Sequence, residues 1–304
     1  MVKELTANIF DIQRFCLSDG DGIRTTVFFK GCPLRCDWCC NPESQSFRPQ
    51  LLIKPFDGCA ECLKCIESCE RGVLSFENGR IVANEEKCGY CAHCESLCAF
   101  DKIKLAGKEY TVDEVMEIIL KDKDYYDDSK GGVTLSGGEV TAHGEFVSAL
   151  MDRLAEENIS VMIETCGYAE SKAFEMIAKK AKRVYFDVKL IDGAEHEKYT
   201  GKDNALILEN LKRAASVTET VIRVPLIPGI NMNGEFYRAL GELAEKVPVK
   251  AVELLPYHRL GVAKYTELGR EYRLSHIRPA ARKENLEAMA EIKKYTSKPV
   301  TFRQ

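Results

Sequence analysis

The chain has 304 residues, a formal net charge of −4 and 30% charged residues, which allows one large domain or two medium ones and argues against a nucleic-acid polyanion as the main partner. No apolar run reaches membrane-spanning length, and the N-terminus lacks the basic-then-apolar order of a signal peptide. We therefore expect a cytoplasmic monomer with no membrane partner. Fourteen cysteines in such a chain favour metal binding over disulfide bonds.

The first predicted element is a buried strand at residues 25–30, which is rich in β-branched and aromatic side chains. It runs into a loop with cysteines at C-x3-C-x2-C spacing, namely Cys32, Cys36 and Cys39. Residues 50–106 follow, with eight of the fourteen cysteines and few apolar runs. This composition predicts a small inserted domain that uses metal as its core.

From residue 110 onward the apolar pattern becomes regular. A helix is predicted at residues 111–121 with Thr111 as its N-cap, and the charged run 121–130 is predicted to be a solvated helix end and loop. Further strands are predicted at residues 133–136, 160–165, 183–189, 220–226 and 250–255. Further helices are predicted near residues 145–156, 172–180, 205–215, 235–246 and 283–294.

Together these elements make six β/α units, which predict a parallel sheet with right-handed crossovers. Six units are fewer than the eight of a closed barrel. The expected fold class is therefore α/β, a partial (β/α)6 barrel formed by residues 1–49 and 107–304, with an insert at residues 50–106. The functional site is expected at the C-terminal ends of the strands.

The insert repeats one cysteine pattern, C-x2-C-x2-C-x3-C, starting at Cys59 and again at Cys88. This is the spacing of a bacterial two-cluster ferredoxin, in which the fourth cysteine of each run binds the other cluster. The first predicted [4Fe–4S] cluster has the ligands Cys59, Cys62, Cys65 and Cys98. The second has the ligands Cys88, Cys91, Cys94 and Cys69. The alternative is a pair of structural zinc sites, which the three-residue last gap suits less well.

The loop after the first strand has only three thiols, Cys32, Cys36 and Cys39. Three thiolates can hold three irons of a [4Fe–4S] cluster and leave the fourth iron open to a substrate. The alternative is a fragment of a zinc site or a disulfide. A closed structural site would need a fourth ligand, so the count of three, after an apolar strand and with Trp38 before the last thiol, favours a catalytic cluster.

This loop resembles the signature of radical S-adenosylmethionine (SAM) enzymes. In that family SAM chelates the open iron, and an electron from the cluster cleaves its sulfonium bond to give a 5′-deoxyadenosyl radical. Motifs along nearly the whole chain resemble the activating enzymes of glycyl radical enzymes: DGDGIRT at 19–25, CCNPES at 39–44, GGVTLSGGE at 131–139, IETCG at 163–167, DVK at 187–189, RVPLIPG at 223–229 and LPYH at 255–258. A two-cluster insert is typical of the activases of the diverse glycyl radical enzymes.

The resemblance implies a SAM site made of residues from the cysteine loop and the strand ends: Trp38, Cys39, Cys40, Gly137, Gly138, Asp187, Val188, Lys189 and His258. Lys189 is expected to pair with the SAM carboxylate and Asp187 with the ribose or a cation, so these two are the catalytic candidates. Glu164, Thr165 and Asp187 are expected to form a monovalent-cation site. Taken alone, Trp38 would be a core residue, the Gly-Gly pair a tight turn, and Asp187 with Lys189 a surface ion pair.

The sequence departs from the family pattern in two places. Asp21 stands where the family commonly has proline, and Cys40 follows the third cluster ligand. Cys40 is expected to point away from Cys39. Cys16 and Cys166 have no assigned role and are expected to be buried thiols.

The resemblance implies an anaerobic activase with three [4Fe–4S] clusters and SAM as cosubstrate. Its radical would abstract a Cα hydrogen from a glycine in a C-terminal loop of a partner glycyl radical enzyme, through an open barrel mouth. The insert would relay electrons from a flavodoxin or ferredoxin. One alternative is a radical SAM enzyme that acts on a small molecule with auxiliary clusters, although two complete cysteine quartets leave no open iron there. Another is a polyferredoxin carrier, which needs no barrel.

Overall fold

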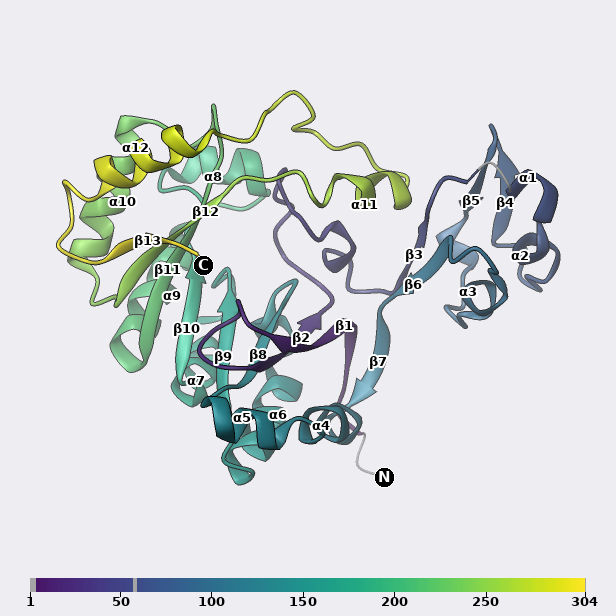
Figure 1. Ribbon diagram of the computed structural model, residues 1–304, viewed down its shortest axis with the longest axis horizontal. Helices are drawn as coiled ribbons and strands as arrows, with labels where there is room; N and C mark the ends of the chain where they lie inside the picture. The colour runs from purple at the N-terminus through teal and green to yellow at the C-terminus, as the bar shows by residue number, and fades with distance from the viewer. Residues whose placement is uncertain (1–3, 57–58, 304) are drawn as a thin grey trace.

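The computed structural model describes residues 4–56 and 59–303, and Figure 1 shows a curved α/β body with a smaller lobe to one side. Within the described residues the main sheet has nine strands in the order β13-β12-β11-β10-β9-β8-β2-β1-β7. The parallel strands include the six that the sequence predicts: β2 (Arg24–Phe29), β8 (Gly132–Gly137), β9 (Ser160–Thr165), β10 (Arg183–Asp187), β11 (Glu219–Leu226) and β12 (Ala251–Pro256). The prediction of a mostly parallel α/β sheet is confirmed.

The prediction lacks the edge strands of this sheet. β1 (Thr6–Cys16) pairs antiparallel with β2 and with β7 (Lys108–Thr111), and β13 (Val300–Phe302) pairs parallel with β12. Directly after β13, Arg303 donates to the Ser18 carbonyl oxygen at 2.9 Å and bonds to the Asp19 carboxylate. This contact links the end of β13, at one edge of the sheet, to the loop that precedes β2.

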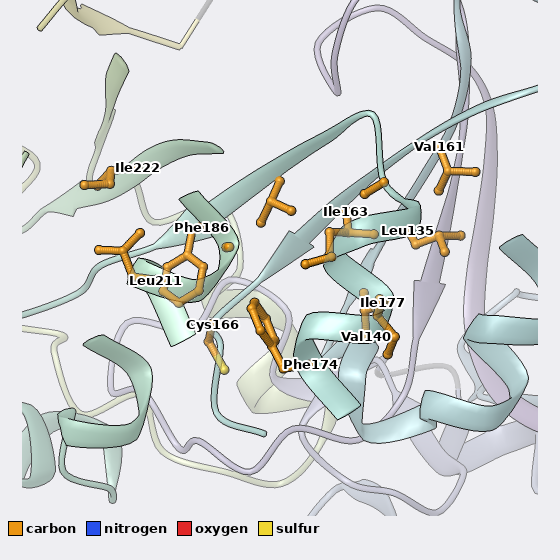
Figure 2. Packing of buried hydrophobic residues seen from close by; sticks show 14 of the residues in the cluster. Leu135, Val140, Val161, Ile163, Cys166, Phe174, Ile177, Phe186, Leu211 and Ile222 are labelled. Carbon is orange, nitrogen blue, oxygen red and sulfur yellow. The ribbon is translucent and has the colours of Figure 1, made fainter. Parts of the chain in front are cut away.

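Helices cover the outer face of the sheet. The long ones agree with the prediction within about two residues: α6 (Gly144–Glu156), α7 (Ser171–Lys180), α9 (Ala205–Val217), α10 (Gly234–Lys246) and α12 (Arg282–Ile292). Short helices that the sequence does not predict are η1 (Pro42–Ser44), η3 (Val140–His143), α8 (Gly193–Thr200) and α11 (Val262–Glu267). Figure 2 shows Leu135, Ile163 and Phe186 of the sheet packed with Phe174 and Ile177 of α7. No helix of the described residues is long and apolar enough to cross a bilayer.

The segment before β8 is more ordered than its composition predicts. α4 (Val112–Leu120) begins with the predicted Thr111 cap, but the charged run then forms a second helix, α5 (Lys123–Ser129). Asp122 and Tyr126 of this run are buried. The Asp122 carboxylate accepts hydrogen bonds from Arg14 Nε at 2.7 Å and from Thr25 Oγ1 at 3.2 Å. The prediction of a solvated helix end and loop holds for most of the run, which is exposed. It is wrong for the loop, which is helical, and for Asp122 and Tyr126, because β1 and β2 supply partners for these two polar side chains.

The lobe beside the barrel contains the cysteine-rich segment. Its elements are β3 (Gln50–Ile53), α1 (Cys59–Cys62), α2 (Lys64–Glu67), β4 (Leu74–Glu77), β5 (Arg80–Ala83), η2 (Glu85–Lys87), α3 (His93–Leu97) and β6 (Ile103–Ala106). β3 pairs with β6 and β4 pairs with β5, both antiparallel and separate from the main sheet. The lobe has its own small apolar cluster, which includes Leu51, Leu74 and Ile103. So few buried apolar side chains give limited hydrophobic stabilisation.

We expect Asp122→Asn to lower the free energy of unfolding by about 1–2 kcal/mol, because it removes the charge that pairs with Arg14 and weakens two hydrogen bonds. Asp124→Asn, in the same run but exposed, is the matched control and should change stability little. Urea unfolding at pH 7 measures both. Equal midpoints for Asp122→Asn and the native protein would contradict the role given to this carboxylate.

Candidate active site

A cavity of about 230 Å³ lies where the parallel strands end. The sequence-predicted residues that line it are Cys32, Cys36, Trp38, Cys39, Cys40, Gly137, Gly138, Asp187, Lys189 and His258. Parallel strands place their C-terminal ends at one edge, so residues far apart in the sequence meet there. Val188 is the exception among the predicted SAM contacts, because its side chain is 1% exposed and packs in the core.

The loop that carries the three cysteines is held by hydrogen bonds of its own backbone. The Cys32 amide donates to the Gln45 carbonyl oxygen at 3.2 Å, and the Arg35 amide donates to the Thr200 carbonyl oxygen at 2.7 Å. Thr200 ends α8, so an element far along the chain fixes the middle of the loop. Leu34 is buried in the barrel core and anchors it from below. The three thiols therefore face the cavity from a backbone that the protein itself restrains.

α11 holds the same loop from the outside. The Tyr265 hydroxyl donates to the Cys39 carbonyl oxygen at 3.0 Å. The Lys264 ammonium donates to Asn41 Oδ1 at 2.9 Å and pairs with the buried Glu43 carboxylate of η1. These contacts join positions more than 200 residues apart in the sequence. No periodic pattern in residues 258–282 points to them, and the sequence analysis assigns no element there.

The two glycines at the end of β8 allow close backbone packing. Gly137 has φ of +117°, and a Cβ at this position would lie 2.3 Å from the backbone of Phe29. A Cβ at Gly138 would lie 2.2 Å from the Gly31 carbonyl oxygen. Any larger residue would push β8 away from β2 and from the cysteine loop. The pair thus has a structural requirement of its own, in addition to the predicted approach to SAM.

Asp187 and Lys189 form a pair that faces the cavity. Lys189 Nζ donates to Asp187 Oδ2 at 2.8 Å, and the lysine side chain is only 13% exposed. Burial alone would lower the pKa of Lys189, but the Asp187 carboxylate and the Cys36 and Cys166 sulfurs raise it by more, so the net pKa is well above its ordinary value. The pair is therefore not a solvated surface ion pair, and it places a positive charge beside the thiols.

Two of the predicted cation ligands, Glu164 and Thr165, bond to different groups of the protein. Glu164 accepts a hydrogen bond from Ser136 Oγ at 2.7 Å and pairs with Arg223 inside the barrel. Thr165 donates to Glu139 Oε1 at 2.6 Å. Consecutive strand residues face opposite sides of a sheet, so Glu164 and Thr165 diverge. A cation site formed with Asp187 therefore stays a prediction, with the side chains of Glu164 and Thr165 bonded to other groups of the protein.

Glu139 and Cys166 belong to the site, although the sequence analysis gives them no role. Glu139 is fully buried, and besides Thr165 its carboxylate accepts the Cys166 amide at 2.7 Å. Cys166 lines the cavity, is buried as predicted, and its hydrogen bond lowers the pKa of Cys32. In the sequence, the signal that could have pointed to Glu139 is its position directly after the Gly-Gly pair of the GGVTLSGGE motif. Glu139 thus joins the end of β8 to the end of β9.

Of the remaining residues without an assigned role, Cys16 and Asp21 lie away from this arrangement, whereas Cys40 lies at its rim. Cys16 is half-buried rather than buried, and its thiol donates to the Gln13 carbonyl oxygen at 3.4 Å. Cys40 is exposed at the cavity rim. Asp21, which replaces the family proline, accepts a hydrogen bond from Arg183 at 3.0 Å, and this bond lowers the pKa of Asp21. Because Arg183 begins β10, this ion pair restrains the loop at the barrel end opposite the cavity.

Comparison with known proteins bears on the whole chain. Residues 85–240 match the Radical SAM superfamily. A trans-4-hydroxy-L-proline dehydratase activating enzyme from Clostridioides difficile is 38% identical over 296 residues, which cover 95% of this chain and 98% of that protein. The chain belongs to the radical SAM activating enzymes of glycyl radical enzymes. The isethionate sulfite-lyase activating enzyme of Oleidesulfovibrio alaskensis is also 38% identical, over 90% of this chain and 91% of that protein.

A solved structure of a radical SAM methyltransferase from Sphaerobacter thermophilus has the same fold as this activase. The TM-score is 0.53 at 13% identity, covering 92% of this chain and 66% of that one. The superfamily match begins at residue 85 and so does not include the three-cysteine loop. The activating enzymes do cover it, because their alignments span at least nine-tenths of the chain.

In the lobe of the activase, cysteines of the two runs lie close together. A cavity of about 400 Å³ is lined by Cys88, Cys91 and Cys94 of the second run together with Cys65 and Cys69 of the first. On the other side, burial and the nearby Cys98 raise the pKa of both Cys59 and Cys65. Crossed ligation of two clusters requires that the two runs approach each other in this way.

The two runs also share a local backbone. Leu63 and Ala92 follow the second cysteine of their runs, and both have positive φ, at 44° and 58°. Gly72 and Asp101, three residues after the fourth cysteine, have φ of 57° and 51°. Matching left-handed positions show that the repeated spacing folds into a repeated structure.

The fourth cysteine of each run accepts a hydrogen bond from a backbone amide. Backbone amides of Val73 and Lys102 donate to the sulfurs of Cys69 and Cys98 at 3.5 and 3.2 Å, and such bonds stabilise cluster thiolates. The described residues contain no group of three Cys, His, Asp or Glu side chains arranged around one ion.

We expect Cys36→Ala to lose about one third of the iron of the anaerobically reconstituted protein, because one of the three clusters that the sequence predicts loses a ligand. Cys40→Ala, four positions away and exposed, is the matched control and should keep its iron. Iron and sulfide analysis measures both variants. Full iron in Cys36→Ala, or an equal loss in Cys40→Ala, would contradict the ligand assignment.

Proposed function

We propose that this activase binds SAM in the cavity at the barrel mouth and activates a partner glycyl radical enzyme. The supporting observation is that one cavity is lined by the thiols of Cys32, Cys36 and Cys39 and by the pair of Lys189 and Asp187. Three thiolates suit a [4Fe–4S] cluster with an open iron, and a mostly buried ammonium suits a carboxylate. When bound, this cluster and SAM supply the radical that removes a Cα hydrogen from the partner's glycine.

Different residues of the cavity would bind different parts of SAM. Lys189 would hold the SAM carboxylate, and the 2.8 Å bond to Asp187 fixes the direction of its ammonium. Trp38 is half-buried and offers an apolar wall for the adenine. The backbone of Gly138 is available to the SAM amino group. His258 is exposed at the rim and would contact the ribose or adenine from the solvent side.

The protein substrate is supported by the open sheet. Among the described strands, the order does not close between β13 and β7. A glycine in a protein backbone must enter as an extended segment, and an open barrel admits one more readily than a closed barrel. Activating enzymes named for a hydroxyproline dehydratase and for an isethionate lyase are equally similar to this chain, at 38%. The overall sequence identity to these relatives therefore does not tell which class of glycyl radical enzyme is the partner.

We also propose that residues 50–106 form a ferredoxin-like insert with two [4Fe–4S] clusters. One is held by Cys59, Cys62, Cys65 and Cys98, and the other by Cys88, Cys91, Cys94 and Cys69. The separate small sheets and the close approach of the two cysteine runs support this assignment. The insert would carry electrons from a flavodoxin or ferredoxin in the cytoplasm, where such thiols stay reduced.

The reconstituted activase, mixed without oxygen with SAM, dithionite and a glycyl radical enzyme of a matching class, should give 5′-deoxyadenosine and a glycyl radical doublet in electron paramagnetic resonance. Lys189→Met should raise KM for SAM about 10-fold or more, because a charge-assisted hydrogen bond is lost. Lys198→Met, an exposed lysine of α8, is the control. Deoxyadenosine without a glycyl radical in any partner class would favour a small-molecule substrate.

We expect Cys62→Ala to keep the site cluster but to slow activation of the partner when a flavodoxin or ferredoxin is the reductant. The change removes a ligand of the insert only, so electron supply suffers while the barrel loop is intact. The rate of glycyl radical formation measures the effect, and the SAM-induced change in the spectrum of the site cluster shows that this cluster is present. Activation at the full rate with the protein reductant would refute the relay.

A further inference from the structure

We propose that the two cysteine quartets of the insert work in a fixed order. The quartet Cys69, Cys88, Cys91 and Cys94, called the inner quartet, lies next to the barrel and passes electrons to the site loop. The quartet Cys59, Cys62, Cys65 and Cys98, called the outer quartet, is the first acceptor. This order rests on the proposed function, which supplies the clusters and the electron donor. Electron transfer slows steeply with distance, so position in the fold decides the order.

The hairpin of β3 and β6 defines a near and a far end of the insert. Gln50 pairs with Ala106 at the end that joins the barrel, and Ile53 pairs with Ile103 at the other end. The near end touches the barrel directly, because a Cβ on Gly107 would lie 2.5 Å from the side chain of Lys30.

The outer quartet lies beyond the far end. Past Ile53, the Lys54 amide donates to the Lys102 carbonyl oxygen at 2.8 Å, which continues the hairpin beyond the end of α11, where Lys54 lines a cavity with Lys264 and Glu267. The Lys102 amide in turn donates to Cys98 Sγ at 3.2 Å. Phe56, three residues before Cys59, and Phe100, two residues after Cys98, contact each other with tilted rings whose centroids lie 4.8 Å apart. In Figure 1 α1, which begins at Cys59, lies at the outer end of the lobe.

The inner quartet is held against the near half of the hairpin on both strands. On β3, the Leu51 amide donates to Glu85 Oε1 at 3.2 Å, and the Cys88 amide donates to the Glu85 carbonyl oxygen at 3.1 Å. On β6, the Leu105 amide donates to Glu95 Oε2 at 3.2 Å, and Glu95 follows Cys94. Leu51 also lines the cavity of the inner quartet. Two carboxylates thus tie this quartet to the end of the insert that meets the barrel.

A buried lysine continues the connection to the site loop. Lys30 is fully buried, and its ammonium donates to Gln50 Oε1 at 3.4 Å and to the Glu43 carbonyl oxygen. Gln50 also contacts the Glu85 carboxylate, at 3.5 Å. Glu43 lies in η1, whose last residue accepts the amide of Gly31 at 2.7 Å, next to Cys32. A continuous set of contacts therefore runs from the inner quartet to the site loop, and none of its members belongs to the outer quartet.

The transfer balances as single-electron steps. A flavodoxin or ferredoxin gives one electron to the outer cluster and is oxidised by one electron. The outer cluster reduces the inner one, and the inner one reduces the site cluster, each returning to its oxidised form. No proton or further reactant is needed for these steps.

The test uses reconstituted full-length protein without a partner enzyme. Cys91→Ser removes the inner cluster and Cys62→Ser the outer cluster, and each variant should lose about one third of the iron. After reduction, the signal of the site cluster is recognised by its shift on adding SAM. Its spin relaxation is measured by microwave power saturation, because a nearby paramagnetic cluster speeds relaxation. We expect Cys91→Ser to lose this enhancement and Cys62→Ser to keep it.

Crossed ligation supplies matched controls for misfolding. Cys69→Ser lies in the first run but belongs to the inner quartet, and Cys98→Ser lies in the second run but belongs to the outer quartet. Cys69→Ser should therefore behave as Cys91→Ser, and Cys98→Ser as Cys62→Ser. Loss of the enhancement in the outer variants, or equal loss in all four, overturns the order. Native protein with iron for one cluster overturns it too, whereas a missing glycyl radical refutes only the proposed function.

Discussion

The active site depends on one close backbone contact, between the end of β8 and the start of the cysteine loop. The Gly138 amide donates to the Phe29 carbonyl oxygen at 2.7 Å, and the Glu139 amide donates to the Gly31 carbonyl oxygen at 2.8 Å. Only glycine at position 138 leaves room for this approach. The contact aligns the three-thiol loop with the strand ends, and the buried Glu139 carboxylate extends it to Cys166. The position of the thiols is therefore set by backbone packing, before any ligand binds.

Below the cavity the barrel interior is polar and closely paired. Arg223 lies between Glu164 and Glu253, with its guanidinium 3.5 Å from the centroid of the Tyr185 ring. Burying these charges is costly unless each has a partner, and here each carboxylate faces the same guanidinium. An open barrel with a charged interior keeps its shape through such pairs, because it lacks the packed layers of branched side chains that fill a closed barrel. This network supports the strand ends on which Asp187 and Lys189 stand.

The insert and the barrel meet through few but specific contacts. Lys30 joins Gln50 of the hairpin to η1, and α11 joins η1 and the cysteine loop through Lys264 and Tyr265. The same short helix η1 thus receives contacts from the insert and from the last third of the chain. These polar contacts can hold the cysteine-rich lobe, with its small apolar core, in a constant position relative to the site.

The sequence by itself determined the parallel strands, the long helices and the grouping of cysteines, because these follow from local periodicity and spacing. β9, for example, is predicted at its observed bounds. Only the tertiary structure decided which polar side chains meet. It turned Glu164 toward Arg223 and away from Thr165, buried Asp122 beside Arg14, and brought α11 onto the cysteine loop. Such pairings depend on strand faces and on contacts between distant segments, neither of which leaves a periodic signal along the chain.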